Sequence, residues 1–323
     1  MYTDIPIWLS SLFIIAGLVA LAWSSDRFVA GAAALARSLG ISEFVVGMVV
    51  VGFGTSAPEL LVSTFSGISG HTNLSIGNAY GSCVFNIIGI LGIAALIRPL
   101  VVKPTVSFIA VPLLSAITML SWFMLRDGTL SRFNALTLLA IFAVVMPLYC
   151  KFDKPGSDDT SDADSMTLAA AIFWTLVGLG VMVGASHILV WGAVDIARAL
   201  GVGELLIGLT IVAIGTSIPE LASAIAAARR REAELVLGNI IGSNLFNTLA
   251  VVGIAGSISP SQGFSQFVVL RDLPLLLAAT LSIAIFGLNY RSPRENGIVA
   301  RWQGLIWVLA LVAYMSLTLY QEL

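Results

Sequence analysis

Two glutamates, Glu59 and Glu220, lie deep within long apolar stretches of the sequence. An ionised carboxylate at the centre of a membrane helix costs about 2.5–3.5 kcal/mol, and no Lys or Arg lies at a comparable depth in either stretch. Something else must therefore compensate the two negative charges. A bound cation is the simplest candidate, so cation binding is the chemistry that this pair indicates.

The residues just before each glutamate can supply further oxygen ligands. Pro58 and Pro219 each remove a backbone N–H and disturb the helix one turn back. This frees carbonyl groups near Gly54 and Gly215, which lipid cannot satisfy but a cation can. Hydroxyl groups are added by the neighbouring residues Thr55, Ser56, Thr216 and Ser217.

A second polar motif follows in each half of the chain. Ser82 and Asn86 are four residues apart, as are Ser243 and Asn247, so each pair can share one face of a helix. The complete set is a cage of hard oxygen donors, which suits Ca²⁺, Mg²⁺, Mn²⁺ or Na⁺ rather than Zn²⁺ or Cu⁺. Mixed ligands from four helices favour Ca²⁺ over Mg²⁺, because Ca²⁺ tolerates flexible geometry.

The composition requires that lipid be the main solvent of the elements that carry these residues. The chain has 323 residues, of which 58% are hydrophobic and 11% charged, whereas soluble domains carry about 25% charged residues. This balance excludes a soluble enzyme, a nucleic-acid-binding protein and a disordered chain. The net charge of −2 indicates no polyanionic partner. The lipid bilayer is the expected surrounding.

A bilayer core of about 30 Å needs roughly 20 apolar residues per helix. By that measure the sequence predicts an all-α polytopic membrane protein with ten transmembrane helices. The predicted segments lie near 6–25, 42–68, 73–97, 104–125, 131–150, 168–190, 204–228, 234–257, 267–288 and 302–320. The first and sixth are expected to extend towards Arg37 and Arg198, because the residues that follow them are still mostly apolar.

The two halves of the chain repeat each other at an offset of 161 residues. The shift places GTSAPE, which begins at Gly54, on GTSIPE, which begins at Gly215. It also places GNAYGSCVFN, which begins at Gly77, on GNIIGSNLFN, which begins at Gly238. The sequence therefore predicts a five-helix repeat in residues 1–150, a polar linker in 151–166 and a second five-helix repeat in 167–323.

Five spans per repeat is an odd number, so the second repeat must enter the membrane inverted. Ten spans then place twelve of the 16 basic residues on one face, leaving Arg126, Arg132, Arg198 and Arg271 on the other. The richer face is expected to be cytoplasmic. Both termini are then outside a prokaryotic cell (plasma) membrane. Inverted repeats are typical of secondary transporters, whose site lies where the repeats meet.

These paired motifs resemble the two α-repeat signatures of the sodium/calcium exchanger family, within the calcium/cation antiporters. The resemblance covers essentially the whole chain, and the short linker resembles prokaryotic members of the family. It implies a secondary antiporter, not an enzyme, that exchanges Na⁺ for Ca²⁺ by alternating access. It implies no cofactor and no obligate protein partner. The first and sixth spans would slide across a core formed by the second, third, seventh and eighth.

The resemblance also implies a role for each motif residue. Glu59 and Glu220 would be the central Ca²⁺ ligands and would also bind Na⁺. The remaining ligands would be the backbone carbonyls of Thr55 and Thr216 and the side chains of Ser56, Ser217, Ser82, Ser243, Asn86 and Asn247. Two positions depart from the family pattern, because Cys83 replaces an Asn and Asn247 replaces an Asp of some relatives.

Several alternatives stay open at this point. An antiporter of H⁺ and Ca²⁺, or of another divalent cation, could use the same glutamates. Relatives that exchange H⁺ carry a glutamate in the second motif where this chain has Ser82 and Ser243, which favours Na⁺. An intramembrane hydrolase would need a base beside its nucleophile, and no Ser–His pair repeats. A passive channel is possible in principle, although broken inverted repeats favour a carrier.

Overall fold

The computed structural model describes residues 6–68, 70, 72–152, 166–200 and 213–322, and these are mostly helical. Within them, eight helices are long and apolar enough to cross a membrane, or nine when one bent pair is counted as a span. The expectation of a helical membrane protein is therefore confirmed. The predicted seventh segment, 204–228, begins outside the described residues. Most of the predicted linker 151–166 and both chain ends also lie outside them.

Within its described residues, the first half of the chain contains one broken helix, residues 43–68, and four continuous ones. Its elements are α1 (Ile7–Leu39), α2 (Glu43–Val46), the π-helix η1 (Gly47–Val51), α3 (Gly52–Thr55), α4 (Ala57–Ile68), α5 (Thr72–Val84), η2 (Phe85–Leu91), α6 (Gly92–Ile97), η3 (Val106–Ala110), α7 (Val111–Leu125) and α8 (Arg132–Phe152).

The second half repeats this order of elements as far as it is described. It contains α9 (Leu168–Ala199), α11 (Ala213–Thr216), α12 (Ile218–Arg230), α13 (Ala233–Leu245), η5 (Phe246–Val251), α14 (Val252–Ile258), η6 (Val268–Asp272), α15 (Leu273–Gly287) and α16 (Arg301–Glu322). Helices α5 and α13 each have 13 residues and start at positions that match under the offset of the sequence repeat.

Both proline motifs break their helices, as the sequence predicts. Helix α3 ends at Thr55, α4 begins at Ala57, and the axis bends by 47° between them. In the second half α11 ends at Thr216 and α12 begins at Ile218. The cause is the missing N–H of the proline, which cannot continue the hydrogen-bond ladder of the preceding turn. Each break places a serine at the point where the helix is interrupted.

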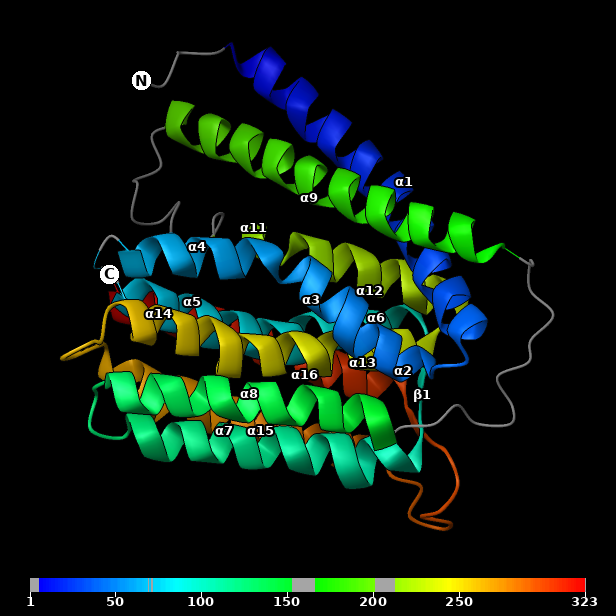
Figure 1. Cartoon of the computed structure of the whole chain (residues 1–323). Helices are drawn as coiled ribbons and strands as arrows, with labels where there is room; N and C mark the ends of the chain where they lie inside the picture. Colours follow the sequence, from blue (N-terminus) through cyan, green and yellow to red (C-terminus); the bar gives the residue numbers. More distant parts are fainter. Residues whose placement is uncertain (1–5, 69, 71, 153–165, 201–212, 323) are drawn as a thin grey trace.

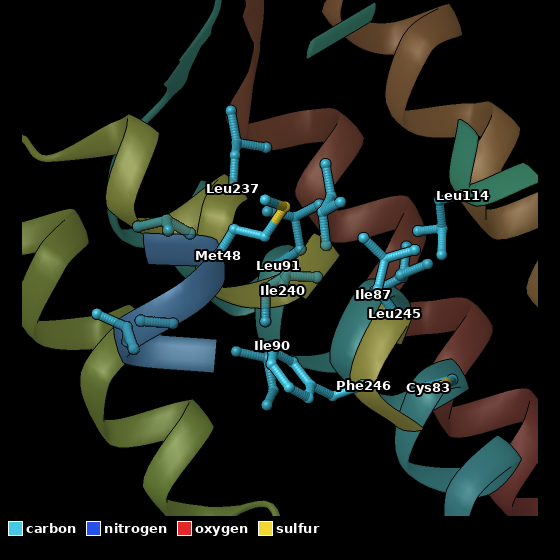
Figure 2. Close-up of a cluster of buried hydrophobic side chains, with 14 of the residues drawn as sticks. Met48, Cys83, Ile87, Ile90, Leu91, Leu114, Leu237, Ile240, Leu245 and Phe246 are labelled. Carbon is cyan, nitrogen blue, oxygen red and sulfur yellow. The ribbon is translucent and has the colours of Figure 1, made fainter. Parts of the chain in front are cut away.

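The core lies where α5 and η2 cross α13 and η5. The most apolar window of the Ala233–Ile258 helix is completely buried, whereas that of α1 is 22% buried. Figure 2 shows the apolar side chains that fill this crossing, among them Met48, Ile87, Leu91, Ile240 and Phe246. The polar motif residues of α5 and α13 are therefore held by the most deeply packed elements of the molecule.

Helices α1 and α9 form a separate pair that crosses one face of the bundle, over α4, α11 and α12, with α7, α8 and α15 on the far side (Figure 1). Glycines allow the two backbones to approach closely. A Cβ at Gly178 would lie 2.7 Å from the Phe28 nitrogen, and a Cβ at Gly31 would lie 2.7 Å from the Thr175 nitrogen. Small residues at such crossings are typical of membrane helix packing.

Two features were not predicted from the sequence. Strands β1 (Leu100–Val102) and β2 (Gly297–Val299) form a short antiparallel pair between two connecting segments. The π-helices η2 and η5 interrupt the α-helices at the second polar motif. Wider π turns leave backbone groups displaced from the regular ladder and occur often at functional sites.

Candidate functional site

The two glutamates lie at the same place in the two halves. Glu59 is in the first turn of α4, Glu220 is in the first turn of α12, and both have no exposed surface. The N-terminus of a helix carries a partial positive charge, which stabilises a nearby anion. Each helix break therefore creates a start at which a buried carboxylate is less costly than it would be in mid-helix.

Serines from the two helix breaks connect the halves reciprocally. Ser56 Oγ donates to Glu220 Oε1 at 3.1 Å, and Ser217 Oγ donates to Glu59 Oε1 at 3.2 Å. Each serine therefore bonds to the glutamate of the other half. The two bonds are related by the same offset that relates the sequence motifs, so the four residues form one site shared between the halves.

The second motif extends this network in the same reciprocal way. Ser56 Oγ lies 2.7 Å from Ser243 Oγ, and Ser217 Oγ lies 3.4 Å from Ser82 Oγ. Asn86 Nδ2 donates to Ser243 Oγ at 3.0 Å. Helices α5 and α13 with their π extensions thus contribute polar groups to the site, as the four-residue spacing predicts.

Several buried polar atoms in this cluster have no hydrogen-bond partner. They are Glu59 Oε2, Glu220 Oε2, Asn86 Oδ1 and both polar atoms of the Asn247 side chain. A buried group without a partner costs about 1–3 kcal/mol, and most buried polar atoms in proteins are paired. All of these atoms except Asn247 Nδ2 are oxygens, which can act as ligands to a cation.

The site contains the two carboxylates that the sequence motifs supply, those of Glu59 and Glu220. Nowhere in the described part of the chain do three or more His, Cys, Asp or Glu residues gather closely enough to hold a metal ion. The remaining oxygens in the cluster belong to hydroxyl and amide groups, which are neutral. A cation bound here would therefore meet two formal negative charges at most.

Thr55 and Thr216 flank the cluster at the ends of α3 and α11. Thr55 Oγ1 donates to the Val51 carbonyl at 3.0 Å and to Asn239 Oδ1 at 3.2 Å. Asn239 Nδ2 in turn donates to Ser223 Oγ at 3.0 Å. The Asn239 side chain, on α13, thus connects α3 with α12.

A cavity of about 320 Å³ lies beside α5. Ser82 and Thr216 line it, together with Asn73, Arg271, Tyr314 and other residues. Gly77 and Gly81 also line it, and a Cβ at either position would meet no atom within 4 Å. Two of the predicted site residues therefore border this cavity.

Sequence reasoning did not assign a role to Asn244. Its Oδ1 accepts from Asn86 Nδ2 at 3.0 Å, and its Nδ2 donates to the Cys83 carbonyl at 3.2 Å. Asn244 therefore fixes α5 against α13 beside the site. The available signal was that position 83, its counterpart under the repeat, departs from the family pattern while Asn244 keeps it.

The fold and the site define a multi-pass membrane protein in which two similar halves share one buried polar centre. Residues 9–149 and 170–320 match the family described as sodium/calcium exchanger protein. The chain belongs to this family of membrane antiporters, which transport ions across membranes and are not enzymes.

Two prokaryotic relatives match this chain over almost the full length of both proteins. CaxA of Alkalimonas amylolytica is 37% identical over 95% of this chain and 98% of its own length. The sodium/calcium exchanger MaX1 of Methanosarcina acetivorans is 28% identical over 96% of this chain and 98% of its own length. The solved structure of the sodium-calcium exchanger NCX_Mj, soaked with Na⁺ and Sr²⁺, matches with a TM-score of 0.84 at 28% identity, over 96% of this chain and 99% of that chain.

Proposed function

We propose that this protein exchanges Na⁺ for Ca²⁺ across the membrane, with Glu59 and Glu220 as the central cation ligands. The observation that carries the proposal is the pair of fully buried carboxylates whose Oε2 atoms have no partner. The similarity to MaX1, a sodium/calcium exchanger, and to NCX_Mj, whose structures were solved after soaks with Na⁺, Ca²⁺ and Sr²⁺, supports the choice of ions.

The remaining predicted ligands complete the coordination in this proposal. Ser56 and Ser217 each bond to one carboxylate oxygen, so their hydroxyl oxygens lie close enough to share a cation with the carboxylates. Asn86 and Asn247 present unpartnered oxygens. Hydroxyls of Ser82 and Ser243, with the backbone carbonyls of Thr55 and Thr216, would flank the central position. Ca²⁺ accepts six to eight oxygens in flexible geometry, which such a mixed set can provide.

The charge of the site explains why one cation must replace another. Two ionised carboxylates without a bound cation are costly in a dry protein interior. The empty site therefore opposes any movement that would close it off from water. One Ca²⁺, or two or more Na⁺ ions, would neutralise them. A reorientation that is permitted only when the site is filled couples the outward movement of one cation to the inward movement of the other.

The architecture that we infer for this exchange is ten spans in two inverted repeats. In support, the connection between α7 and α8 and the corresponding connection between α15 and α16 lie at opposite ends of the bundle (Figure 1). The first connection forms a β-bridge between Leu130 and Ser261, whereas the second contains β2, which pairs with β1. Equivalent connections at opposite ends are what an inversion requires. The basic residues then place the protein in the cell membrane with both termini outside.

The moving part in this proposal is the α1–α9 pair. The two helices pack along their length through glycines and are joined by a hydrogen bond from Ser10 to Asp195. Their lipid-facing sides are largely exposed in the isolated chain, whereas α5 and α13 are fixed in the core. A peripheral pair that slides over a packed core would open the site to each side in turn.

Na⁺ is favoured over H⁺ as the coupling ion because the second motif carries Ser82 and Ser243 rather than glutamates. The test is uptake of ⁴⁵Ca²⁺ into proteoliposomes in which a gradient of Na⁺, K⁺ or H⁺ is imposed separately. We expect an outward Na⁺ gradient at clamped pH to drive uptake and the other two gradients to have no effect. Uptake that follows only the pH gradient, or that proceeds without a counter-cation, would overturn the proposal.

A further inference from the structure

The carbonyl group of Gly215 has lost its usual partner and has found a substitute. It lies four residues before Pro219, so the missing proline N–H leaves it without the normal helical hydrogen bond. Ser186 Oγ, from α9, donates to this carbonyl at 3.2 Å. One turn further along α9, Val190 covers the same glycine, where a Cβ would meet its side chain at 2.5 Å. Helix α9 is thereby attached to the broken helix of the second half.

The first half contains the same residues in a different arrangement. Under the offset of 161, Ser25, Val29 and Gly54 correspond to Ser186, Val190 and Gly215. Ser25 Oγ donates instead to the Ala22 carbonyl of its own helix, at 3.2 Å. Gly54 is covered by Leu179 of α9, and its carbonyl is approached by the backbone N–H of Ser56.

We infer that Ser186 and Ser25 are two alternating positioning residues, which we call the serine latches. Each latch donates to the carbonyl that the proline of its repeat has freed, Gly215 for Ser186 and Gly54 for Ser25. In the state seen here the Ser186 latch is closed and the Ser25 latch is open. In the opposite state the two exchange. This inference rests on the proposed alternating-access function.

The physical basis is that corresponding residues of the two repeats, Ser186 and Ser25, have different hydrogen-bond partners in this state. In the state seen here only the Gly215 carbonyl is bonded to the serine of its repeat, and movement of the α1–α9 pair would interchange the environments of the two repeats. A net hydrogen bond shifts a two-state ratio by about twofold to tenfold. The latches therefore do not bind the cation. They set how the two states are populated and hold the broken helix of the closed side.

The test measures the population of the present state with a reporter cysteine. Gly77→Cys places a thiol in the cavity, where the added Cβ meets open space. In proteoliposomes, the rate of its modification by a membrane-impermeant thiol reagent reports how often the cavity is open. The labelling of the chain that lacks the reporter is subtracted. The variants are Ser186→Ala, Ser25→Ala, the double variant and Ser24→Ala, a buried neighbour that also donates within its own helix.

We expect Ser186→Ala to lower the ratio of the present state to the opposite state by about twofold to tenfold, and to slow labelling by up to the same factor, because it removes the closed latch. Adding Ser25→Ala should return the rate to within twofold of the parent, since both states then lack their latch, and Ser24→Ala should leave it unchanged. A double variant that remains as slow as Ser186→Ala, or is slower, would overturn the inference, as would an unchanged rate in Ser186→Ala. Na⁺-driven Ca²⁺ uptake by the reporter chain is measured alongside, so that failure of the latches is distinguished from failure of the exchange function.

Discussion

At the scale of single residues, the site is marked by buried polar atoms that have no hydrogen-bond partner. Asn247 lies fully buried in η5 with both side-chain polar atoms unpartnered, beside a cluster in which serines already bond to the two carboxylates. In the proposed site, a neutral amide at this position would provide one oxygen ligand and no charge. The residue at position 247 would then set how many negative charges the cation meets.

Replacing that amide by a carboxylate tests this interpretation. Asn247→Asp changes the volume little and adds a third acid, so we expect Ca²⁺ to bind about tenfold tighter or more. Turnover should fall, because one Ca²⁺ no longer neutralises the site. Binding and initial uptake rates measure the two effects, and Asn296→Asp, the same change in an exposed loop, is the control. Equal Ca²⁺ affinity in Asn247→Asp and the parent would contradict the placement of Asn247 in the site.

The sequence indicated the residues that form the polar cluster because the repeat marks them. Acids, prolines and serines that recur at one offset within apolar stretches have few structural explanations, and Ser56, Ser217, Ser82 and Ser243 all join the predicted cluster. Ser186 could not be found in this way. A serine in an apolar helix is common, and its bond to the Gly215 carbonyl depends on how α9 lies across α11.

At the scale of elements, the close packing of α1 on α9 is the feature that the proposed movement depends on. Gly178 lies at the crossing, where an added Cβ would lie 2.8 Å from the Phe28 Cα, whereas Gly180, on the same helix, has open space around it. The same substitution at these two positions therefore separates helix crowding from any general effect of replacing glycine.

We expect Gly178→Ala to destabilise the protein by about 1–3 kcal/mol through overpacking and to reduce exchange. Gly180→Ala should leave both properties close to those of the parent. Thermal unfolding in detergent and ⁴⁵Ca²⁺ uptake in proteoliposomes measure the two properties. If both variants behaved alike, the close approach of α1 and α9 would not be a requirement of the mechanism.

Element boundaries could be predicted where one local cause decides them. Pro58 and Pro219 fix the breaks, and the lengths of the apolar stretches predict the spans. The π-helices and the β1–β2 pair could not be predicted, because nothing local encodes them. A strand of three residues forms only when another segment is brought beside it, here across almost 200 positions. The wider turns of η2 and η5 form where the helices cross in the core.

At the scale of the whole molecule, the proposed inversion of the two halves makes a direct prediction about topology. Asp127, in the connection between α7 and α8, and Glu295, in the connection between α15 and α16, are both exposed. Cysteines at these equivalent connections should be labelled from opposite sides of the membrane, Asp127→Cys from outside and Glu295→Cys only after permeabilisation. Labelling of both from the same side would exclude inverted repeats.

The central claim is that Glu59 and Glu220 together hold the transported cation. Equilibrium binding of ⁴⁵Ca²⁺ to the purified protein tests it most directly, in the parent, in Glu59→Gln, in Glu220→Gln and in the exposed control Glu295→Gln. The account predicts saturable Ca²⁺ binding that Na⁺ displaces, that each buried substitution abolishes and that the control retains. Ca²⁺ binding of parental strength in either Glu59→Gln or Glu220→Gln would contradict it.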